Sequence, residues 1–481
     1  MGAVTSSLAG TSSAPGTGAQ PRGSLMRRVL ILTPLFPPDA QVGAKRPLRF
    51  VRHLRDHGWE PVVLCLPRPL AMNADDGLGD AVPEGVEVFR DYASGLAYGA
   101  WRWIMGLGES ALGRGMDSPA AGAPRAQSPV AYHVLKEVER LGWSVLPLDQ
   151  LLPWIPSAVR AARRIARPRR VDAVLAIGDP FSAFLAGAAL KRSMGLPLVL
   201  DLRDPWTIDP AWFSKKVGVL RRFEAFVERT LFAGAETVIL NTQEALRAYR
   251  KLYPELAGQM ECIPNGFDRS LFLPAPAVVR GGPFTLLHYG NVFGGRSIAP
   301  ILRAVRRLVD AGELAVGDVR VVIRGELDPA DVAAAAALGL GDRVEARAYR
   351  PYREAMIELR AADVLVALEA RDLTLQIPAK VYDYLCAERP ILSVGQPGEA
   401  AELVERLGVG MHFAPEDEAG IAAALGRWLQ NRHAPPGARA SAGAAAAAGA
   451  GGMSIDDYDA PKQTALLAAV LDRAVASAVA R

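Results

Sequence analysis

The clearest indication of the fold class is residues 29–66, VLILTPLFPPDAQVGAKRPLRFVRHLRDHGWEPVVLCL. Residues 29–32 form a short apolar run that predicts a buried strand, and the loop after it holds three prolines and ends at Gly43. We expect a helix over residues 44–57 and a second strand over residues 61–66. A strand, a loop with glycine, a helix and a strand make a βαβ unit, which predicts a parallel sheet with ligands near the carboxyl ends of its strands.

The same alternation of strands and helices continues beyond this unit. A stretch rich in proline and glycine, from Pro274 to Pro283, separates two groups of predicted strands. They lie at residues 173–177, 198–200 and 237–240, and then at 284–287, 319–323, 344–346, 364–368 and 390–394. The predicted fold class is α/β, with two Rossmann-like domains, each built on a doubly wound parallel sheet.

The 481 residues are too many for one compact core, so we expect several segments. Composition and turn signals place them as follows: a leader rich in Gly, Ser, Ala and Thr at 1–25, an N-terminal domain at 26–280 with an irregular insertion at about 92–150, a C-terminal domain at 281–432, an Ala/Gly/Pro linker at 433–452, and a final helix within 453–481.

Composition excludes several classes of function. The formal net charge is only +4, whereas nucleic-acid-binding proteins usually concentrate a larger basic excess, so no nucleic acid is expected as partner. Cys65, Cys262 and Cys386 lie far apart and form no metal-ligand cluster. The most apolar stretch, residues 171–190, contains two aspartates, and residues 1–25 lack the hydrophobic core of a secretion signal. We therefore expect a cytoplasmic protein.

A first candidate site is the loop GNVFGGRS at residues 290–297, where a predicted strand passes into a helix. Gly290, Gly294 and Gly295 allow backbone N–H groups to approach an anion, and a helix N-terminus favours negative charge. Arg296 offers a planar guanidinium to a phosphate. An ordinary strand-to-helix loop with a solvated arginine explains the same residues.

A second candidate is QIPAKVYDYL at residues 376–385. Pro378 favours the start of a helix, which puts Lys380 in its first turn, where a cation opposes the helix dipole. Such a local conflict suggests that an anion binds there. Asp383, one turn later, has the chemistry to accept two ribose hydroxyls. The alternative is a Lys–Asp pair on the surface.

A third candidate is DLRDPW at residues 201–206, at the carboxyl end of a predicted strand. Arg203 and Asp204 are expected either to form a structural ion pair or to contact a sugar or an acceptor in a cleft between the domains. Asp201 and Asp204 resemble a metal-binding pair only weakly, and we expect no metal.

Two further positions are expected to be structural. Asn265-Gly266 has the composition of a turn with positive φ that directs the chain towards the second domain. His288, at the end of a predicted strand, is typical of a core histidine whose hydrogen bonds are satisfied.

Five segments, taken together, resemble one family: LTPLFPPDAQVGAKR, LVLDLRDPW, IPNGFD, HYGNVFGGRS and IPAKVYDYLCAERPIL. They occur in the order and spacing of bacterial family-four glycosyltransferases, in the subgroup with a D-F-R-D-P-W-like element. The resemblance covers about residues 27–429. It implies a GT-B fold, in which two such domains face each other across a cleft, a retaining transfer without an obligatory metal, and a final helix that crosses back to the N-terminal domain.

The resemblance also implies roles for single residues of the donor site. Gly43 would lie beside the donor diphosphate, and Arg296 near the place of the family's phosphate-binding basic residue. Asn291 stands where many relatives have an arginine. Arg203 falls near the N-domain histidine that many relatives place beside the sugar.

The family's Glu–seven residues–Glu element is incomplete in this chain. Asp383 occupies the place of its second glutamate, which holds the ribose. Leu375 stands at the place of the first, which contacts the sugar. That contact would then come from backbone groups near Gln376 to Ala379, which include Ile377 and Pro378, or from another side chain.

The resemblance predicts transfer of a sugar from a UDP- or GDP-linked donor to a glycan or lipid-linked acceptor, in cell-surface or exopolysaccharide synthesis, with no cofactor besides the donor. Gly294, Gly295, Arg296 and Lys380 would neutralise the diphosphate. A nucleotide-sugar 2-epimerase and a non-catalytic nucleotide-sugar-binding protein are the alternatives.

A membrane surface is a further expected partner. The arginine-rich helix at residues 157–170 and the tryptophans near Trp101 suggest peripheral attachment to an anionic membrane at its inner face. A solvated basic helix explains the arginines equally well.

Overall fold

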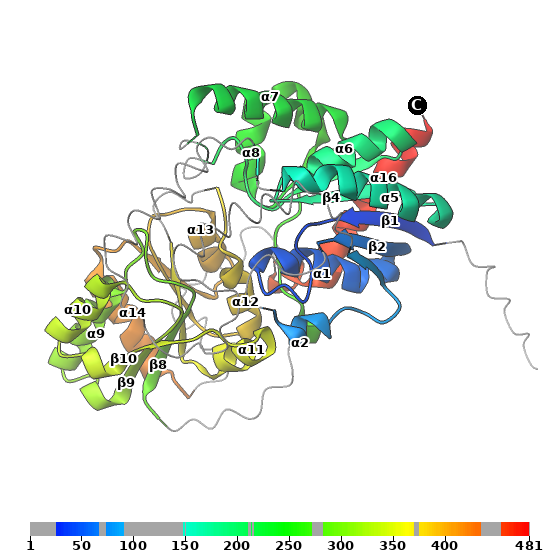
Figure 1. Cartoon of the computed structure of the whole chain (residues 1–481). Coiled ribbons are helices and arrows are strands. Elements are labelled where there is room, and N and C mark those ends of the chain that lie inside the picture. Colours follow the sequence, from blue (N-terminus) through cyan, green and yellow to red (C-terminus); the bar gives the residue numbers. More distant parts are fainter. Residues whose placement is uncertain are drawn as a thin grey trace, which may run out of the picture.

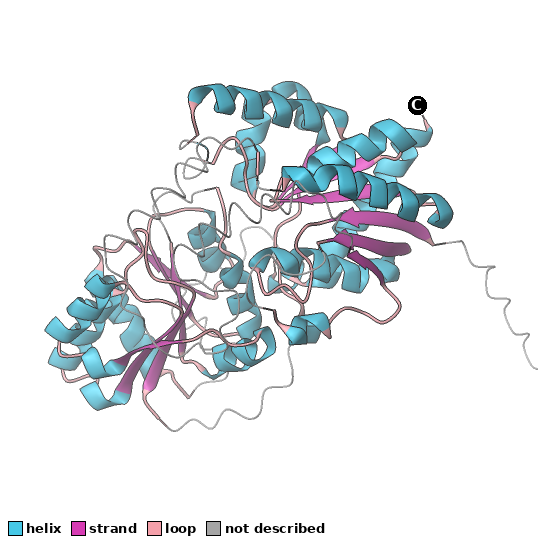
Figure 2. Ribbon diagram, viewed as in Figure 1, coloured by secondary structure: helices cyan, strands magenta, loops and turns pink. Residues whose placement is uncertain are grey.

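The computed structural model describes residues 26–66, 74–90, 148–149, 151–209, 213, 216–271, 282–369, 375–433 and 454–480. Within these ranges the chain forms two parallel sheets, each covered by helices on both faces (Figures 1 and 2). The predicted leader, most of the insertion and nearly all of the linker lie outside the described residues, as do the tryptophans near Trp101.

The first sheet has seven strands in the order β3-β2-β1-β4-β5-β6-β7, all parallel. They are β1 (Arg27–Leu32), β2 (Trp59–Cys65), β3 (Glu87–Arg90), β4 (Ala173–Gly178), β5 (Leu198–Leu202), β6 (Thr237–Leu240) and β7 (Met260–Cys262). The helices of this unit are α1 (Lys45–His53), α2 (Asp76–Gly79), α5 (Ile155–Arg169), α6 (Ser182–Met194), α7 (Gly218–Gly234) and α8 (Gln243–Leu252).

The central strand β1 shows why the sheet is covered on both faces. Its last four residues are fully buried, and their side chains alternate between two cores. Leu30 and Leu32 pack in the core formed with α5, α6, α7 and α8. Val29 and Ile31 pack in the core formed with α1 and the last helix, α16 (Ala460–Val479).

The second sheet has six strands in the order β10-β9-β8-β11-β12-β13, again all parallel. They are β8 (Phe284–Tyr289), β9 (Val319–Arg324), β10 (Val344–Arg347), β11 (Val364–Leu368), β12 (Ile391–Val394) and β13 (Gly410–Phe413). Its helices are α9 (Ala299–Asp310), α10 (Pro329–Ala337), α11 (Tyr352–Ala361), α12 (Ala379–Ala387), α13 (Glu399–Arg406) and α14 (Glu418–Gln430). In both sheets the strand order reverses beside the first strand, which places a crevice at the carboxyl ends.

The predicted α/β class is confirmed, and every strand predicted from an apolar run is present within about two residues. The short and partly exposed strands β3 and β13 were missed. Their residues are mixed in polarity, so they give no clear hydrophobic period.

The last helix packs on the first unit, far from its neighbours in the sequence. Leu467 and Leu471 are fully buried against β1 and α1. Asp472 accepts hydrogen bonds from Arg27 (2.7 Å) and from the Trp59 indole (3.1 Å). The chain therefore crosses back from the second unit to the first, as Figure 1 shows in red.

The turn at Asn265-Gly266 is structural, but the expected positive φ is wrong at both residues. Asn265 is held by Arg46 and Arg49, which both donate to its Oδ1 at 3.2 Å. A Cβ on Gly266 would lie 2.1 Å from the carbonyl oxygen of Tyr458. Glycine is required here because the segment before α16 approaches closely.

Among the described residues, no helix is both long and apolar enough to cross a membrane.

Candidate functional site

Lys380, in the first turn of α12, lies against the end of β8. Its Nζ is 3.1 Å from Nε2 of His288, whose Nδ1 is 2.8 Å from the carbonyl oxygen of Val366. Because a carbonyl only accepts, Nδ1 carries the proton and Nε2 is left to accept from Lys380. The prediction that His288 is a satisfied core histidine holds, but its second partner is the candidate lysine.

Gly290 gives this lysine the space that it occupies. The glycine has φ +137°, and a Cβ there would lie 2.8 Å from the Lys380 ammonium. Glycine is therefore required at this position both by the backbone conformation and by the lysine.

Arg296 completes a cluster of basic groups. Burial, and then the nearby Arg296, lowers the pKa of Lys380 to about 7. Burial, and then Lys380, holds the pKa of His288 well below its ordinary value. Arg296 has an Nε without a hydrogen-bond partner, and burial lowers its pKa as well. Within the described ranges no carboxylate forms an ion pair with either cation, so the cluster is suited to an anion.

The rest of the 290–297 loop contains two more glycines with positive φ. Gly294 and Gly295 have φ of +65° and +87°, and both are exposed. Asn291 braces the loop, because its Oδ1 accepts from the backbone N–H of Glu326 and from the hydroxyl of Tyr349, both at 2.9 Å.

The start of α12 touches the first unit. Pro378 is the N-cap residue of the helix and Ile377 is buried in the core beside it. Thr242 donates to the carbonyl oxygen of Leu375 at 2.8 Å, and Gln376 donates to Asp209 at 3.2 Å. The helix N-terminus that carries Lys380 is thus placed at the junction of the two units, as α12 and α1 show in Figure 1.

Asp383 lies on α12 three residues after Lys380 and has partners of its own. It is 6% exposed, accepts from the Tyr352 hydroxyl at 2.7 Å, and forms an ion pair with Lys45 of α1 at 3.1 Å. Both carboxylate oxygens are therefore engaged, one within the second unit by Tyr352 and one across the junction by Lys45. A contact to ribose stays a prediction and would require these bonds to be exchanged.

In the first unit, Arg203 lies between two carboxylates at the ends of neighbouring strands. Its guanidinium forms ion pairs with Asp179, after β4, and with Asp204 at 3.3 Å. A Cβ on Gly43 would lie 1.8 Å from Arg203 Nη1. The structure thus brings Gly43 together with Arg203 and Asp204. In the sequence, 160 positions separate Gly43 from Arg203.

Asp204 has an unusual protonation equilibrium. Burial raises its pKa to about 6, against the opposing effect of Arg203 and with a smaller contribution from Asp179. A carboxyl group with such a pKa exchanges protons near neutral pH, as catalytic acids and bases do.

Asp201, by contrast, is structural. It is fully buried and paired through both oxygens with Arg46 at 2.8 Å. The weak likeness of Asp201 and Asp204 to a metal pair is therefore wrong, because Arg46 occupies both oxygens of the first aspartate.

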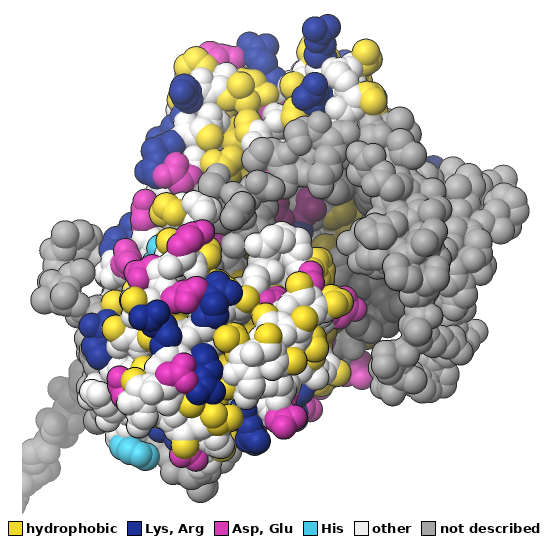
Figure 3. Space-filling model, turned by 90° about the vertical axis from the view of Figure 1, so that its left-hand side faces the viewer, with side chains coloured by type: hydrophobic (Ala, Val, Ile, Leu, Met, Phe, Trp, Pro, Cys, Tyr) yellow, Lys and Arg dark blue, Asp and Glu magenta, His cyan; other side chains and the backbone are white. Residues whose placement is uncertain are grey.

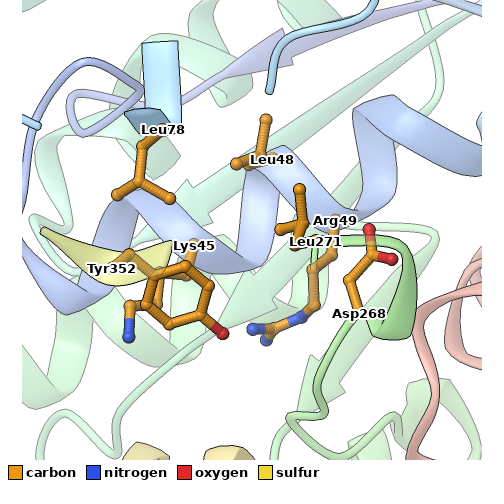
Figure 4. Close-up of a pocket in the computed structure, with 7 residues that line it drawn as sticks. All are labelled: Lys45, Leu48, Arg49, Leu78, Asp268, Leu271 and Tyr352. Carbon is orange, nitrogen blue, oxygen red and sulfur yellow. The ribbon is translucent and has the colours of Figure 1, made fainter. Parts of the chain in front are cut away.

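A small pocket at the junction is lined mainly by residues of the first unit, with Tyr352 of α11 across from them (Figure 4). It has room for about one water molecule. Its lining residues are Lys45, Leu48, Arg49, Leu78, Asp268, Leu271 and Tyr352. The pocket is too small for a nucleotide.

Sequence reasoning missed Asp179 and the contacts of Lys45 and Tyr352. Asp179 follows directly after the apolar strand 173–177, and residues in that position lie at the ligand-binding edge of a parallel sheet. Its place directly after a predicted buried strand could therefore have marked Asp179 as a candidate site residue. For Lys45 and Tyr352 the sequence carries no signal, because their partner Asp383 lies in the other unit for Lys45 and 31 positions further along the chain for Tyr352.

Two family models match the chain. Residues 97–271 match "Glycosyltransferase Family 4", and residues 283–431 match "Glycosyl transferases group 1". Together with the two facing parallel-sheet units, these matches support a glycosyltransferase of the GT-B fold, with one matched glycosyltransferase domain in each unit. Enzymes of this class transfer a sugar from a nucleotide-sugar donor.

Individual relatives agree with this class. The chain is 28% identical over 274 residues to a Pseudomonas aeruginosa protein named "Probable glycosyltransferase WbjE", a match that spans 53% of this chain and 66% of the relative. Among solved structures, HepE of Anabaena in complex with UDP has a TM-score of 0.56 at 16% identity, over 93% of this chain and 100% of HepE. Sucrose-phosphate synthase of Thermosynechococcus elongatus has a TM-score of 0.54 at 14% identity, over 94% and 97%.

Proposed function

We propose that this glycosyltransferase is a retaining enzyme without a metal requirement, which transfers the sugar of a UDP- or GDP-linked donor to a glycan or lipid-linked acceptor in cell-surface or exopolysaccharide synthesis. The subgroup implied by the D-F-R-D-P-W-like element is part of this proposal. A nucleoside diphosphate is favoured because HepE, which shares the fold, was solved with UDP.

One observation carries the proposal. Lys380 and Arg296 share a desolvated site, with His288 beside them and no carboxylate to neutralise them among the described residues. Two uncompensated cations in such a place are costly unless an anion joins them. Gly290 and the α12 N-terminus add open backbone and a favourable dipole, which together fit a diphosphate.

The same groups account for the chemistry of donor cleavage. The bond between the sugar's anomeric carbon and the diphosphate oxygen breaks, and a bond to the acceptor oxygen forms. Charge that develops on the leaving diphosphate is stabilised by Lys380 and Arg296. We propose that the acceptor's proton passes to the leaving phosphate on the same face, with Arg203 and Asp204 orienting the sugar or the acceptor.

Donor binding is tested with a thermal-shift screen of UDP-, GDP- and TDP-sugars, because a ligand of the folded state raises stability. Calorimetry of the matching nucleotide with Arg296→Ala then tests the site. We expect loss of both binding and transfer, with Arg307→Ala, at an exposed arginine in the last turn of α9, as control. Unchanged binding in Arg296→Ala would show that the diphosphate lies elsewhere.

A nucleotide-sugar 2-epimerase is the second candidate, because Asp179 and Asp204 place two carboxylates beside Arg203. Incubation of a UDP-sugar without acceptor distinguishes the two activities. Conversion of the sugar would favour the epimerase, and transfer that depends on an added acceptor would favour the glycosyltransferase. Donor binding without any turnover would indicate a non-catalytic relative, for which Leu375 at the place of the family's first glutamate is the relevant feature.

A further inference from the structure

Helix α7 buries its carboxylates and exposes its phenyl rings. Glu224 and Glu228 are fully buried, whereas Phe223 and Phe226 are 46% and 68% exposed. Figure 3 accordingly shows hydrophobic side chains among the basic ones at the top of the molecule. A surface helix normally has the opposite polarity, because burying a charge is costly and burying a phenyl ring is favourable. The two glutamates are therefore expected to have a role inside the first unit.

The buried side of α7 holds the loop that follows β5. Glu224 accepts a hydrogen bond from the indole of Trp206 at 3.0 Å. Glu228 accepts from the backbone N–H of Thr207 at 3.0 Å and from its hydroxyl at 2.5 Å. Both partners lie within three residues of Asp204. The two glutamates thus fix the chain directly after the charged residues of the site.

Trp206 also connects this loop to the other side of Arg203. Its ring stacks on Phe181, with the ring centroids 4.4 Å apart and an angle of 9° between the planes. Asp179 and Asp204 are the two carboxylates that neutralise Arg203. Each of them lies two residues before a ring of this stack. A shift of the stack would therefore move both ion-pair partners of the arginine.

Glu228 is the centre of this network. Besides the two groups of Thr207, the hydroxyls of Tyr249 and Tyr253 donate to it, both at 2.9 Å. Tyr249 in turn accepts from the backbone N–H of Trp206 at 2.8 Å. No cation forms an ion pair with Glu228 in the part of the chain that the structure describes. Only these donors stabilise the buried carboxylate, so their positions and that of the loop depend on it.

We propose that Glu228 is a positioning residue, which keeps Arg203 and Asp204 in the orientation that sugar transfer requires. The inference rests on the role that the proposed function gives to this pair, the orientation of the sugar or the acceptor. A carboxylate that only stabilised the fold would change the amount of folded chain and leave the kcat of the folded molecules intact. A positioning residue lowers kcat itself, because a small displacement of the pair weakens its contact in the transition state.

The test compares kcat and nucleotide affinity in Glu228→Gln, with the UDP-, GDP- or TDP-sugar that the thermal-shift screen selects and with its free nucleoside diphosphate. The amide keeps the size of the side chain but turns an NH₂ group towards donors, so the loop must shift. We expect kcat to fall about tenfold or more, with unchanged affinity for the diphosphate, whose proposed site is in the second unit.

Glu236→Gln is the matched control. This carboxylate is also buried in the first unit, and it accepts from the backbone N–H of Leu198 at 2.7 Å, at the opposite end of β5. Its substitution is expected to leave kcat unchanged.

Two further comparisons separate positioning from stability. Thr207→Val removes one donor to Glu228 and keeps the shape of the side chain, so kcat should fall about fivefold, whereas Thr207→Ser keeps the hydroxyl and should retain kcat. Arg203→Lys already displaces the pair. Addition of Glu228→Gln to this variant should therefore cost little further kcat, because two substitutions that act on the same pair are not additive.

The proposal is overturned if Glu228→Gln keeps its kcat, or if its loss and that of Arg203→Lys multiply in the double variant. It is also overturned if Thr207→Val and Thr207→Ser have equal kcat, a comparison that decides the matter even where Glu228→Gln does not fold. If Arg203→Lys is impaired and Glu228→Gln is not, only the role of Glu228 is wrong. Full kcat in Arg203→Lys would instead show that the proposed function is wrong about the pair, and its positioning would then be wrong as well.

Discussion

The two halves of the candidate site differ in whether carboxylates neutralise the buried cation. In the first unit, Arg203 is neutralised by Asp179 and Asp204. In the second, Lys380 has a neutral histidine and another cation as its neighbours. A compensated cation can hold its position without a ligand, whereas an uncompensated one gains most when an anion arrives. This difference favours the second unit as the place where the anion binds. It favours the first unit as the part that positions the sugar or the acceptor.

Removing the uncompensated charge gives the largest expected effect. Lys380→Met keeps the length of the side chain but removes the ammonium. A hydrogen bond to a charged group contributes about 1.5–3 kcal/mol, so UDP or GDP should bind roughly 10- to 100-fold more weakly by calorimetry.

The matched control for this prediction is Lys251→Met, which changes an exposed lysine on α8. The corresponding nucleoside, which lacks the diphosphate, should bind both variants as it binds the unchanged chain. If Lys380→Met binds UDP or GDP as tightly as the unchanged chain does, the anion does not bind at Lys380. The proposed difference between the two halves of the site would then be wrong.

A substitution that displaces Arg203, the neutralised cation of the first unit, should slow sugar transfer and leave nucleotide binding intact. In Gly43→Ala, the new methyl group would lie 1.8 Å from Arg203 Nη1 and 2.6 Å from Leu35 Cδ1, so the arginine must shift away from its carboxylates. We expect kcat to fall about tenfold, equivalent to ~1.4 kcal/mol, with unchanged nucleotide affinity.

Gly258→Ala is the control, because nothing lies within 4 Å of a Cβ at that position. A loss of nucleotide affinity in Gly43→Ala, with kcat preserved, would place the glycine beside the diphosphate and not beside the sugar-positioning arginine.

The uncompensated lysine also predicts a pH dependence. Burial and Arg296 lower the pKa of free Lys380 to about 7, and His288, which is neutral, and Arg296 are the titratable groups that face it. A bound diphosphate favours the ammonium and raises this pKa, so binding above pH 7 takes up a proton. Affinity should therefore fall about fivefold from pH 7 to pH 8, because one pKa unit corresponds to about tenfold.

Proton uptake is measured by calorimetry in buffers of different ionisation enthalpy. The pH dependence should disappear in Lys380→Met. An affinity that stays constant between pH 7 and pH 8 in the unchanged chain would show that the lysine is already charged without a ligand.

The sequence predicted the fold well because buried parallel strands give continuous apolar runs, as in residues 29–32 and 173–177. It also singled out Lys380 as a candidate, since a cation in the first turn of a helix conflicts with the helix dipole. These signals are local, and each can be recognised within about ten residues.

What the sequence could not provide is the pairing of side chains across long separations. Asp179 and Arg203 meet because β4 and β5 are neighbours in the sheet. Lys45 and Asp383 meet because two units face each other, which no pattern within either segment encodes.

The smallest expected effect concerns the contact between the halves. Asp383→Asn keeps an oxygen for the Tyr352 hydroxyl and removes the charge that pairs with Lys45. Because this ion pair is partly exposed at Lys45, we expect it to contribute roughly 0.5–1 kcal/mol, which is a two- to fivefold change in nucleotide affinity at most.

Lys45→Met, which removes the other partner of the same ion pair, should give a change of similar size. Binding of 2′-deoxy-UDP decides what Asp383 does. If the carboxylate only joins α1 to α12, the unchanged chain and Asp383→Asn lose the same factor when the ribose hydroxyl is removed. If Asp383 instead exchanges Lys45 and Tyr352 for the ribose, the substitution alone weakens UDP more than tenfold and the deoxy nucleotide shows no further loss. The engaged carboxylate oxygens favour the first outcome, in which α12 serves the anion site through Lys380 and the junction through Asp383.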